Sequence, residues 1–177
     1  MKTLLAAVCL AVCAAPLALA ESKIELDAKV QEARTQFAKH TSAGAELAAK
    51  AHGVLVFPSV IKAGFGVGGE YGEGALQVGG KTVGYYNIAA ASIGLQLGAQ
   101  ARSEIILFMT AEALRKFRDS EGWKAGVDGS VALATLGAGG SIDTDTAKKP
   151  IIGFIYSNEG LMFNLTFEGA KLNKIEK

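Results

Sequence analysis

The stretch from Gly64 to Gly74, GFGVGGEYGEG, constrains the fold more than any other part of this sequence. It is dominated by glycine, and most of its glycines alternate with larger residues. Successive side chains of a strand point to opposite faces, so this spacing leaves one face of a strand nearly bare. We therefore predict a strand whose bare face lies close against another backbone, an aromatic ring or a ligand.

Glycine is also frequent in the rest of the chain. There are 22 glycines in 177 residues, and apolar residues make up 50% of the sequence. The glycines lie inside apolar segments rather than in a linker, and there are only 3 prolines. This composition predicts a single ordered domain with a substantial core.

The first twenty residues have the layout of a secretory signal peptide. Lys2 precedes an apolar run, and the small residues Ala18 and Ala20 stand just before Glu21. This layout predicts cleavage between Ala20 and Glu21, which leaves residues 21–177 as one domain. We expect the mature protein to be periplasmic or secreted, either free or attached peripherally to the envelope membrane.

Two alternatives to a cleaved leader are a retained membrane anchor and a lipoprotein. The apolar run is short for a membrane span. A lipoprotein needs a small residue before its cysteine, whereas Cys9 and Cys13 each follow a valine. Both cysteines lie in the leader, so the mature chain would have no disulfide, no thiol nucleophile and no thiolate metal site.

Charge disfavours nucleic acid as a partner. The chain has 18 basic and 17 acidic side chains, and removal of Lys2 with the leader makes the two numbers equal. Proteins that bind nucleic acid are usually basic overall, because they neutralise phosphates. We expect no nucleic-acid partner.

An amphipathic helix is predicted over residues 21–50. Its apolar stripe is formed by Leu26, Val30, Ala33 and Phe37, which recur at helical spacing. The remaining positions carry charges of both signs, whereas an interfacial membrane helix prefers a strongly cationic polar face. We therefore expect the stripe to pack on the core, and residues 41–44 to interrupt the helix.

After Gly53 the pattern changes to strands. Val54–Phe57 reads as a short strand ended by Pro58, and Gly79-Gly80 suits a two-residue hairpin turn. Thr110 can cap a short helix, and the final seven residues are polar. Further strands are predicted at 75–78, 83–88, 92–100, 105–109, 127–134, 137–142, 151–157 and 161–167. The predicted class is α+β, with an N-terminal amphipathic helix and a mostly antiparallel, glycine-rich, strongly curved sheet or small barrel.

Tests for catalytic and cofactor motifs fail. Gly64, Gly66 and Gly69 match GxGxxG, but the residues that follow are poor helix formers, and a dinucleotide site needs a helix there. His40 and His52 belong to no HExxH motif and lie beside no GxSxG serine. We predict no catalytic residue, no cofactor and no metal site.

Basic residues gather in two groups, at 115–124 and at 171–177. Such groups are usually solvated surfaces. The functional alternative is contact with anionic headgroups, since cations near a charged membrane contribute about 1 kcal/mol each.

Several segments together resemble the SYLF-domain family over residues 30–175. They are KAGFGVGGEYGEGAL at 62–76, SIGLQLGAQ at 92–100, ILFMT at 106–110 and GLMF at 160–163. The glycine-aromatic block followed by SxGxQxG is the most specific part. The family includes bacterial exported proteins and eukaryotic proteins that bind phosphoinositide membranes, and its yeast members also bind actin.

The resemblance implies a lipid-binding domain without known catalysis, here in a bacterial exported member. In eukaryotic relatives an N-terminal amphipathic helix engages the membrane, and residues 23–39 occupy the matching place. Actin is not an expected partner of an exported chain. Phospholipids of the envelope, or its membrane surface, are the expected substitute.

The leading hypothesis is thus an exported protein that binds lipid or phospholipid at the bacterial cell envelope. One alternative is a structural or partner-binding envelope protein without a lipid ligand, and a second is a hydrolase. The lipid-binding candidates are the cations beside the glycine-rich strands and the aromatic residues between the glycines: Lys62, Phe65, Tyr71, Lys81 and Arg102.

Overall fold

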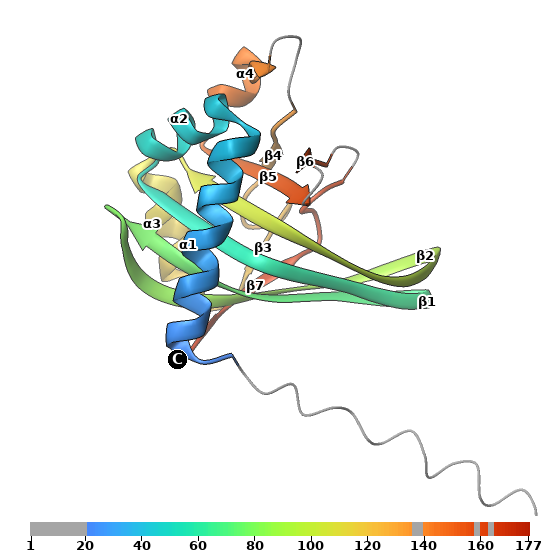
Figure 1. Ribbon diagram of the computed structural model, residues 1–177. Helices are drawn as coiled ribbons and strands as arrows, with labels where there is room; N and C mark the ends of the chain where they lie inside the picture. The colour runs from blue at the N-terminus through green and yellow to red at the C-terminus, as the bar shows by residue number, and fades with distance from the viewer. Residues whose placement is uncertain (1–20, 136–139, 158–159, 163–164) are drawn as a thin grey trace, which may run out of the picture.

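The computed structural model describes residues 21–135, 140–157, 160–162 and 165–177. In the two long strands it describes the backbone of residues 65–66 and 92–99 but not their side chains. Figure 1 shows two helices lying across a strongly curved sheet. The predicted signal peptide, residues 1–20, lies outside the described residues.

The N-terminal helical segment consists of two helices, α1 (Lys23–His40) and α2 (Ser42–Lys50). Each begins at a capping hydroxyl: the Glu25 amide donates to Ser22 Oγ at 3.3 Å, and the Gly44 amide donates to Thr41 Oγ1 at 3.0 Å. The predicted interruption is confirmed, although Thr41 alone separates the helices. The predicted apolar stripe is buried, and no helix among the described residues has the length and apolar character needed to cross a membrane.

A single long hairpin forms most of the sheet. Strands β1 (Gly53–Val78) and β2 (Lys81–Phe108) pair antiparallel from end to end. The predicted turn at Gly79-Gly80 is confirmed, with φ values of 57° and 78° that suit glycine. The short strands predicted along this region are merged into these two.

Pro58 does not end a strand, so that prediction was wrong. The pairing register shifts between Phe57 and Val60, which places Pro58 in an irregularity of β1. A bulge tolerates a residue without an amide hydrogen, because the ladder is already interrupted there.

The other strands attach to the far edge of β2 and to each other. They are β3 (Trp123–Lys124), β4 (Ala132–Leu133), β5 (Ile151–Ser157), β6 (Gly160–Leu161) and β7 (Lys171–Ile175). The sheet has the order β3-β7-β2-β5-β4, with β1 paired to β2 and β6 paired to β5. Among the strand pairs that the structure describes, only β4–β5 is parallel, so the predicted α+β class with a mostly antiparallel sheet is confirmed.

Three segments differ from the predicted strands. Residues 171–175, expected as a polar tail, form β7, in which Leu172 is buried next to the exposed Lys171. The strands predicted at 127–134 and 161–167 shrink to the short β4 and β6. The strand predicted at 137–142 falls partly on residues 136–139, which lie outside the described residues.

Glycine allows β1 to fold back over itself. A Cβ on Gly72 would lie 2.7 Å from the carbonyl oxygen of Ser59, and one on Gly74 would overlap the carbonyl oxygen of Val56. The returning half of the strand therefore packs directly on the backbone of its outgoing half. The glycine spacing predicted that another backbone, an aromatic ring or a ligand lies against the bare face, and the neighbour is another backbone.

The curled sheet separates two apolar layers. Its inner face carries an aromatic group, Tyr86, Phe108, Phe117 and Trp123, to which α3 (Ala111–Asp119) contributes Phe117. Thr110 caps α3 as predicted. The outer face packs against α1, and α4 (Thr144–Ala147) lies in the connection before β5.

Candidate lipid-binding site

Four charged side chains form a cluster on the inner side of the curled hairpin. Lys62 comes from the outgoing half of β1, Glu70 from its returning half, and Arg102 and Glu104 from β2. Arg102 Nη2 donates to Glu70 Oε2 at 2.6 Å, and Arg102 Nε donates to Glu104 Oε1 at 2.8 Å. Lys62 Nζ lies 3.3 Å from Glu70 Oε1. The cluster thus joins the two halves of the folded strand.

Two members of this cluster are almost completely buried. The side chain of Arg102 is 5% exposed and that of Glu104 is 1% exposed. Burial raises the pKa of Glu104, and Arg102 opposes that rise through its charge and its hydrogen bond. Within the described part of the chain, Glu104 Oε2 has no hydrogen-bond partner.

A cavity of about 440 Å³ opens beside Arg102. It lies where β5 stops pairing with β2, at Ser103. Its lining is Pro58, Ser59, Gln100, Ala101, Arg102, Ser103, Ser157 and Met162. Hydroxyl, amide and guanidinium groups in one recess can hydrogen-bond to a polar or anionic headgroup.

A second cavity, of about 350 Å³, continues from the first beneath α1. The two share Pro58, Ser59 and Ser103, so the irregularity in β1 lies between them. The second cavity reaches His40 and Tyr156. We call these two adjoining cavities the polar groove; the second of them is lined by α1.

The hairpin beyond this groove projects from the rest of the molecule, as Figure 1 shows for the end labelled β1 and β2. In the described pairing, residues 90–102 of β2 pair with β1 alone. We call residues 61–71 and 90–101 the ribbon end. Among the side chains described there, three large ones are exposed: Ile61 at 52%, Val67 at 72% and Tyr71 at 48%.

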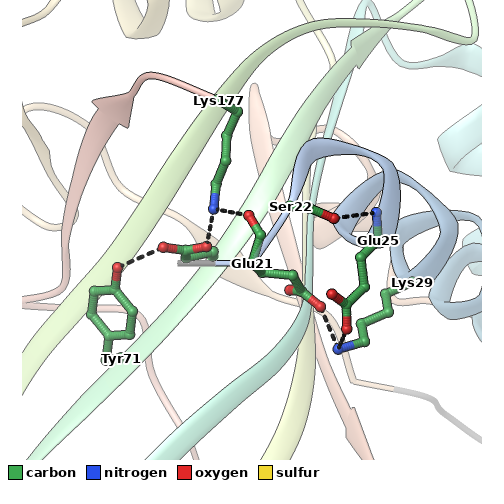
Figure 2. A network of polar contacts seen from close by, with 7 residues as sticks. Glu21, Ser22, Glu25, Lys29, Tyr71 and Lys177 are labelled. Carbon is green, nitrogen blue, oxygen red and sulfur yellow. Dashed lines mark hydrogen bonds and ion pairs between the residues drawn. The ribbon is translucent and has the colours of Figure 1, made fainter. Parts of the chain in front are cut away.

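A separate polar network fastens the start of the described chain to its end (Figure 2). Lys177 Nζ donates to the main-chain carbonyl of Glu21 at 2.6 Å and to Glu73 Oε2 at 2.5 Å. Tyr71 donates to the other oxygen of Glu73 at 3.0 Å, and partial burial together with this carboxylate raises the pKa of Tyr71. On the helix side, Lys29 pairs with Glu21.

The lipid-binding residues nominated from the sequence lie in three different parts of the structure. Lys62 and Arg102 meet through Glu70, beside the cavity. Tyr71 belongs to the Lys177 network, and Lys81 lies at the hairpin turn, at the opposite end of β2. The side chain of Phe65 lies outside the described residues.

Sequence reasoning missed the two carboxylates of the cluster. Neither Glu70 nor Glu104 is among the residues that the sequence nominates. Glu104 did carry a signal, since it directly precedes the apolar run Ile105–Phe108, where an acid is expected only with a partner.

Both basic groups of the sequence contribute to one further cavity, of about 290 Å³. Arg115 and Arg118 of α3 line it together with Lys174 of β7. Arg115 is 3.6 Å from Asp119, which also lines the cavity. Val83 and Tyr86 complete the wall on the hairpin-turn side of β2, so this basic cavity lies outside the ribbon end.

Metal ligands do not gather anywhere in the described ranges: no group there combines three His, Cys, Asp or Glu side chains in a suitable arrangement. His40 borders the groove, whereas His52 donates its main-chain amide to Phe108 at 2.8 Å as β1 begins.

The curled sheet thus carries a polar groove bordered by a buried arginine that two carboxylates hold in place. The Ysc84 family, described as Las17-binding protein actin regulator, matches residues 89–176, from the middle of β2 to the end of β7. On this match, that part of the chain belongs to the SYLF-domain family, which confirms the resemblance; the family is one of binding domains. No curated protein matches the chain.

Proposed function

We propose that this protein is exported and binds phospholipid at the bacterial cell envelope through its ribbon end. One observation carries the proposal: exposed apolar side chains stand next to a recess that contains a buried arginine. Ile61 directly precedes Lys62, and its pairing partner Ala101 directly precedes Arg102. Apolar groups at the end of the ribbon would enter the acyl layer, while the cations behind them would lie at headgroup depth.

Helix α1 is a poor membrane contact in this fold. Its apolar stripe is buried against the outer face of the sheet, and Ile24 is its exposed large apolar side chain, at 83%. Insertion of α1 would therefore require the helix to leave the core. The ribbon end needs no such rearrangement, because Ile61 and Val67 are already exposed.

The family description also names Las17 binding and actin regulation. We do not extend these partners to this chain, because the signal peptide expected at residues 1–20 would take it away from cytosolic actin. Export is therefore part of the proposal, and detection of a chain that begins at Glu21 in the periplasm would test it.

The test is co-sedimentation of the mature protein with vesicles of phosphatidylcholine alone and with added phosphatidylglycerol. Val67→Ser is expected to weaken binding about tenfold, because transfer of a valine side chain out of water contributes about 1.5 kcal/mol or more. Val127→Ser is the matched control, since Val127 is also 72% exposed but lies outside the ribbon end. It should bind like the wild type.

A second control separates insertion of the ribbon from attraction of charge at the basic cavity. Arg118→Glu reverses a charge on α3, in the basic cavity and outside the ribbon end, so it should leave vesicle binding within about twofold of the wild type. If folded wild-type protein sediments with neither vesicle type, the lipid-binding proposal is wrong. If Val67→Ser and Val127→Ser weaken binding equally, the ribbon end is not the contact.

A further inference from the structure

The charged cluster beside the groove is electrically balanced when every member is ionised. Lys62 and Arg102 supply two positive charges, and Glu70 and Glu104 supply two negative charges. A ligand anion in the cavity would then approach an arginine whose charge is already cancelled. The cavity attracts an anion only if one carboxylate is neutral.

Arg102 is oriented so that it can donate hydrogen bonds to an anion in the cavity. Its guanidinium carries five N–H groups, and the two bonds to Glu70 and Glu104 fix its plane. Because Arg102 also lines the cavity, its remaining donors are available to a group placed there. Ser59 and Gln100 provide further polar groups in the same recess.

Glu104 is the member of the cluster that is suited to neutrality. One of its oxygens accepts from Arg102, and the other has no hydrogen-bond partner in the described structure. A buried carboxylate oxygen without a donor is unfavourable, and a proton on it removes the buried charge. Glu104 does not line the cavity, so it would act on the ligand through Arg102.

We infer that an anion of the phosphodiester class binds beside Arg102 together with a proton taken up by Glu104. The inference rests on the proposed function for its lipid source and adds the class of headgroup, anionic rather than zwitterionic. Protonation leaves the cluster with one net positive charge, at Arg102, where the anion binds. Glu104 is a positioning residue in this scheme, because it sets the charge that Arg102 presents.

The sign of the pH dependence follows from linkage. The bound anion favours protonated Glu104, so the bound state takes up a proton and the affinity rises as pH falls. Burial already raises the pKa of this carboxyl in the free protein, and the anion raises it further. Between those two pKa values the affinity should change by up to about tenfold per pH unit, and outside them it should be constant.

Few other groups can produce this dependence. Glu70 acts on Glu104 from β1 and is itself paired with Lys62, and Arg102 faces Glu104 from its own strand. Its pairing partners, Phe57 of β1 and Ile155 of β5, do not titrate. His40 borders the adjoining cavity, and because histidine changes charge near neutral pH, His40→Gln is the necessary control.

The experiment is calorimetric titration of the mature protein with dihexanoylphosphatidylglycerol at about pH 5 and about pH 8, in buffers of different ionisation enthalpy. This lipid is soluble, and its phosphodiester does not titrate in that range. We expect affinity at least about tenfold higher at the lower pH, with uptake of close to one proton where the affinity changes. Glu104→Gln should bind at both pH values as the wild type does at the lower one, without proton uptake, and His40→Gln should keep the wild-type dependence.

The remaining probes identify the source and class of the ligand. Dihexanoylphosphatidylcholine should bind weakly at both pH values; equal binding of the two lipids would overturn the anionic class. Dimethyl phosphate tests the headgroup without chains, and if it alone binds with proton uptake, the site takes free phosphodiesters rather than lipid.

Two results would overturn the proton coupling while leaving the proposed function intact. One is lipid binding that does not depend on pH. The other is unchanged pH dependence in Glu104→Gln. Absence of binding to every soluble lipid at every pH would overturn the whole inference, whereas the proposed function is decided separately by vesicle sedimentation. If Glu104→Gln fails to fold, the proton uptake measured for the wild type tests by itself whether binding is coupled to protonation.

Discussion

Gly74 lies against the carbonyl oxygen of Val56, eighteen positions earlier in the same strand, with no room for a Cβ between them. This contact is where the returning half of β1 crosses its outgoing half. The bare strand face predicted from the glycine spacing is therefore a packing surface within one strand.

Gly74→Ala should destabilise the protein, because neither the backbone of Val56 nor the ring of Phe57 can move away easily. We expect a loss of about 1–3 kcal/mol in the free energy of unfolding, measured by urea titration followed by circular dichroism. Gly69→Ala is the matched control, since its Cβ would meet its nearest neighbour, the Ala90 carbonyl oxygen, at 3.7 Å. A change of more than about 0.5 kcal/mol in the control would show that loss of glycine itself, not the crossing, is responsible.

The Lys177 network should contribute to stability in the same assay. The side chain of Lys177 is 5% exposed, and its removal leaves the Glu73 carboxylate, 15% exposed, without its cation. Lys177→Ala is expected to cost about 1–3 kcal/mol and to increase hydrogen exchange in the first turn of α1, which begins beside Glu21. Lys116→Ala removes an equally charged but 63% exposed partner of Glu112, and it should cost less than about 1 kcal/mol. Equal losses in the two variants would contradict the role assigned to the network.

Alkaline stability should depend on Tyr156, which joins β5 to α1 by donating to the carbonyl oxygen of Ala33 at 2.6 Å. Burial raises the pKa of this hydroxyl to about 12, from 10.0 for a free tyrosine. The folded state thus holds the proton more tightly than the unfolded state, so the contribution is complete below about pH 10 and disappears as pH rises through about 12.

Tyr156→Phe should therefore be less stable than the wild type by about 1 kcal/mol at neutral pH. The difference between the two proteins should shrink between about pH 10 and pH 12. Denaturant titrations across this range measure it, and a difference that stays constant would show that the hydroxyl does not titrate with unfolding.

Local patterns were sufficient for some elements of the fold. The buried stripe of α1, the Thr110 cap and the Gly79-Gly80 turn each depend on residues close in sequence. Other features depend on partners far apart. Strand β7 exists because β2 offers an edge to Leu172 and its neighbours, which a polar segment does not reveal by itself.

The candidate site, too, could be predicted from the sequence only in part. Lys62 and Arg102 could be nominated from their positions beside glycine-rich strands. Their meeting could not be predicted, because Glu70 and Arg102 are 32 positions apart and face each other only after β1 has folded back. The orphaned oxygen of Glu104 likewise follows from burial in three dimensions.

The pairing of the ribbon end has a consequence for how such proteins can vary. Because residues 90–102 of β2 pair only with β1 in the described sheet, this part can lengthen without disturbing β5 or β7. A single inserted residue would turn every later side chain to the opposite face, so insertions should come as two residues in each half of each strand, because both strands run out to the ribbon end and back. Each such step would extend the reach of the ribbon by about 7 Å, which makes its length a separately adjustable dimension of the molecule.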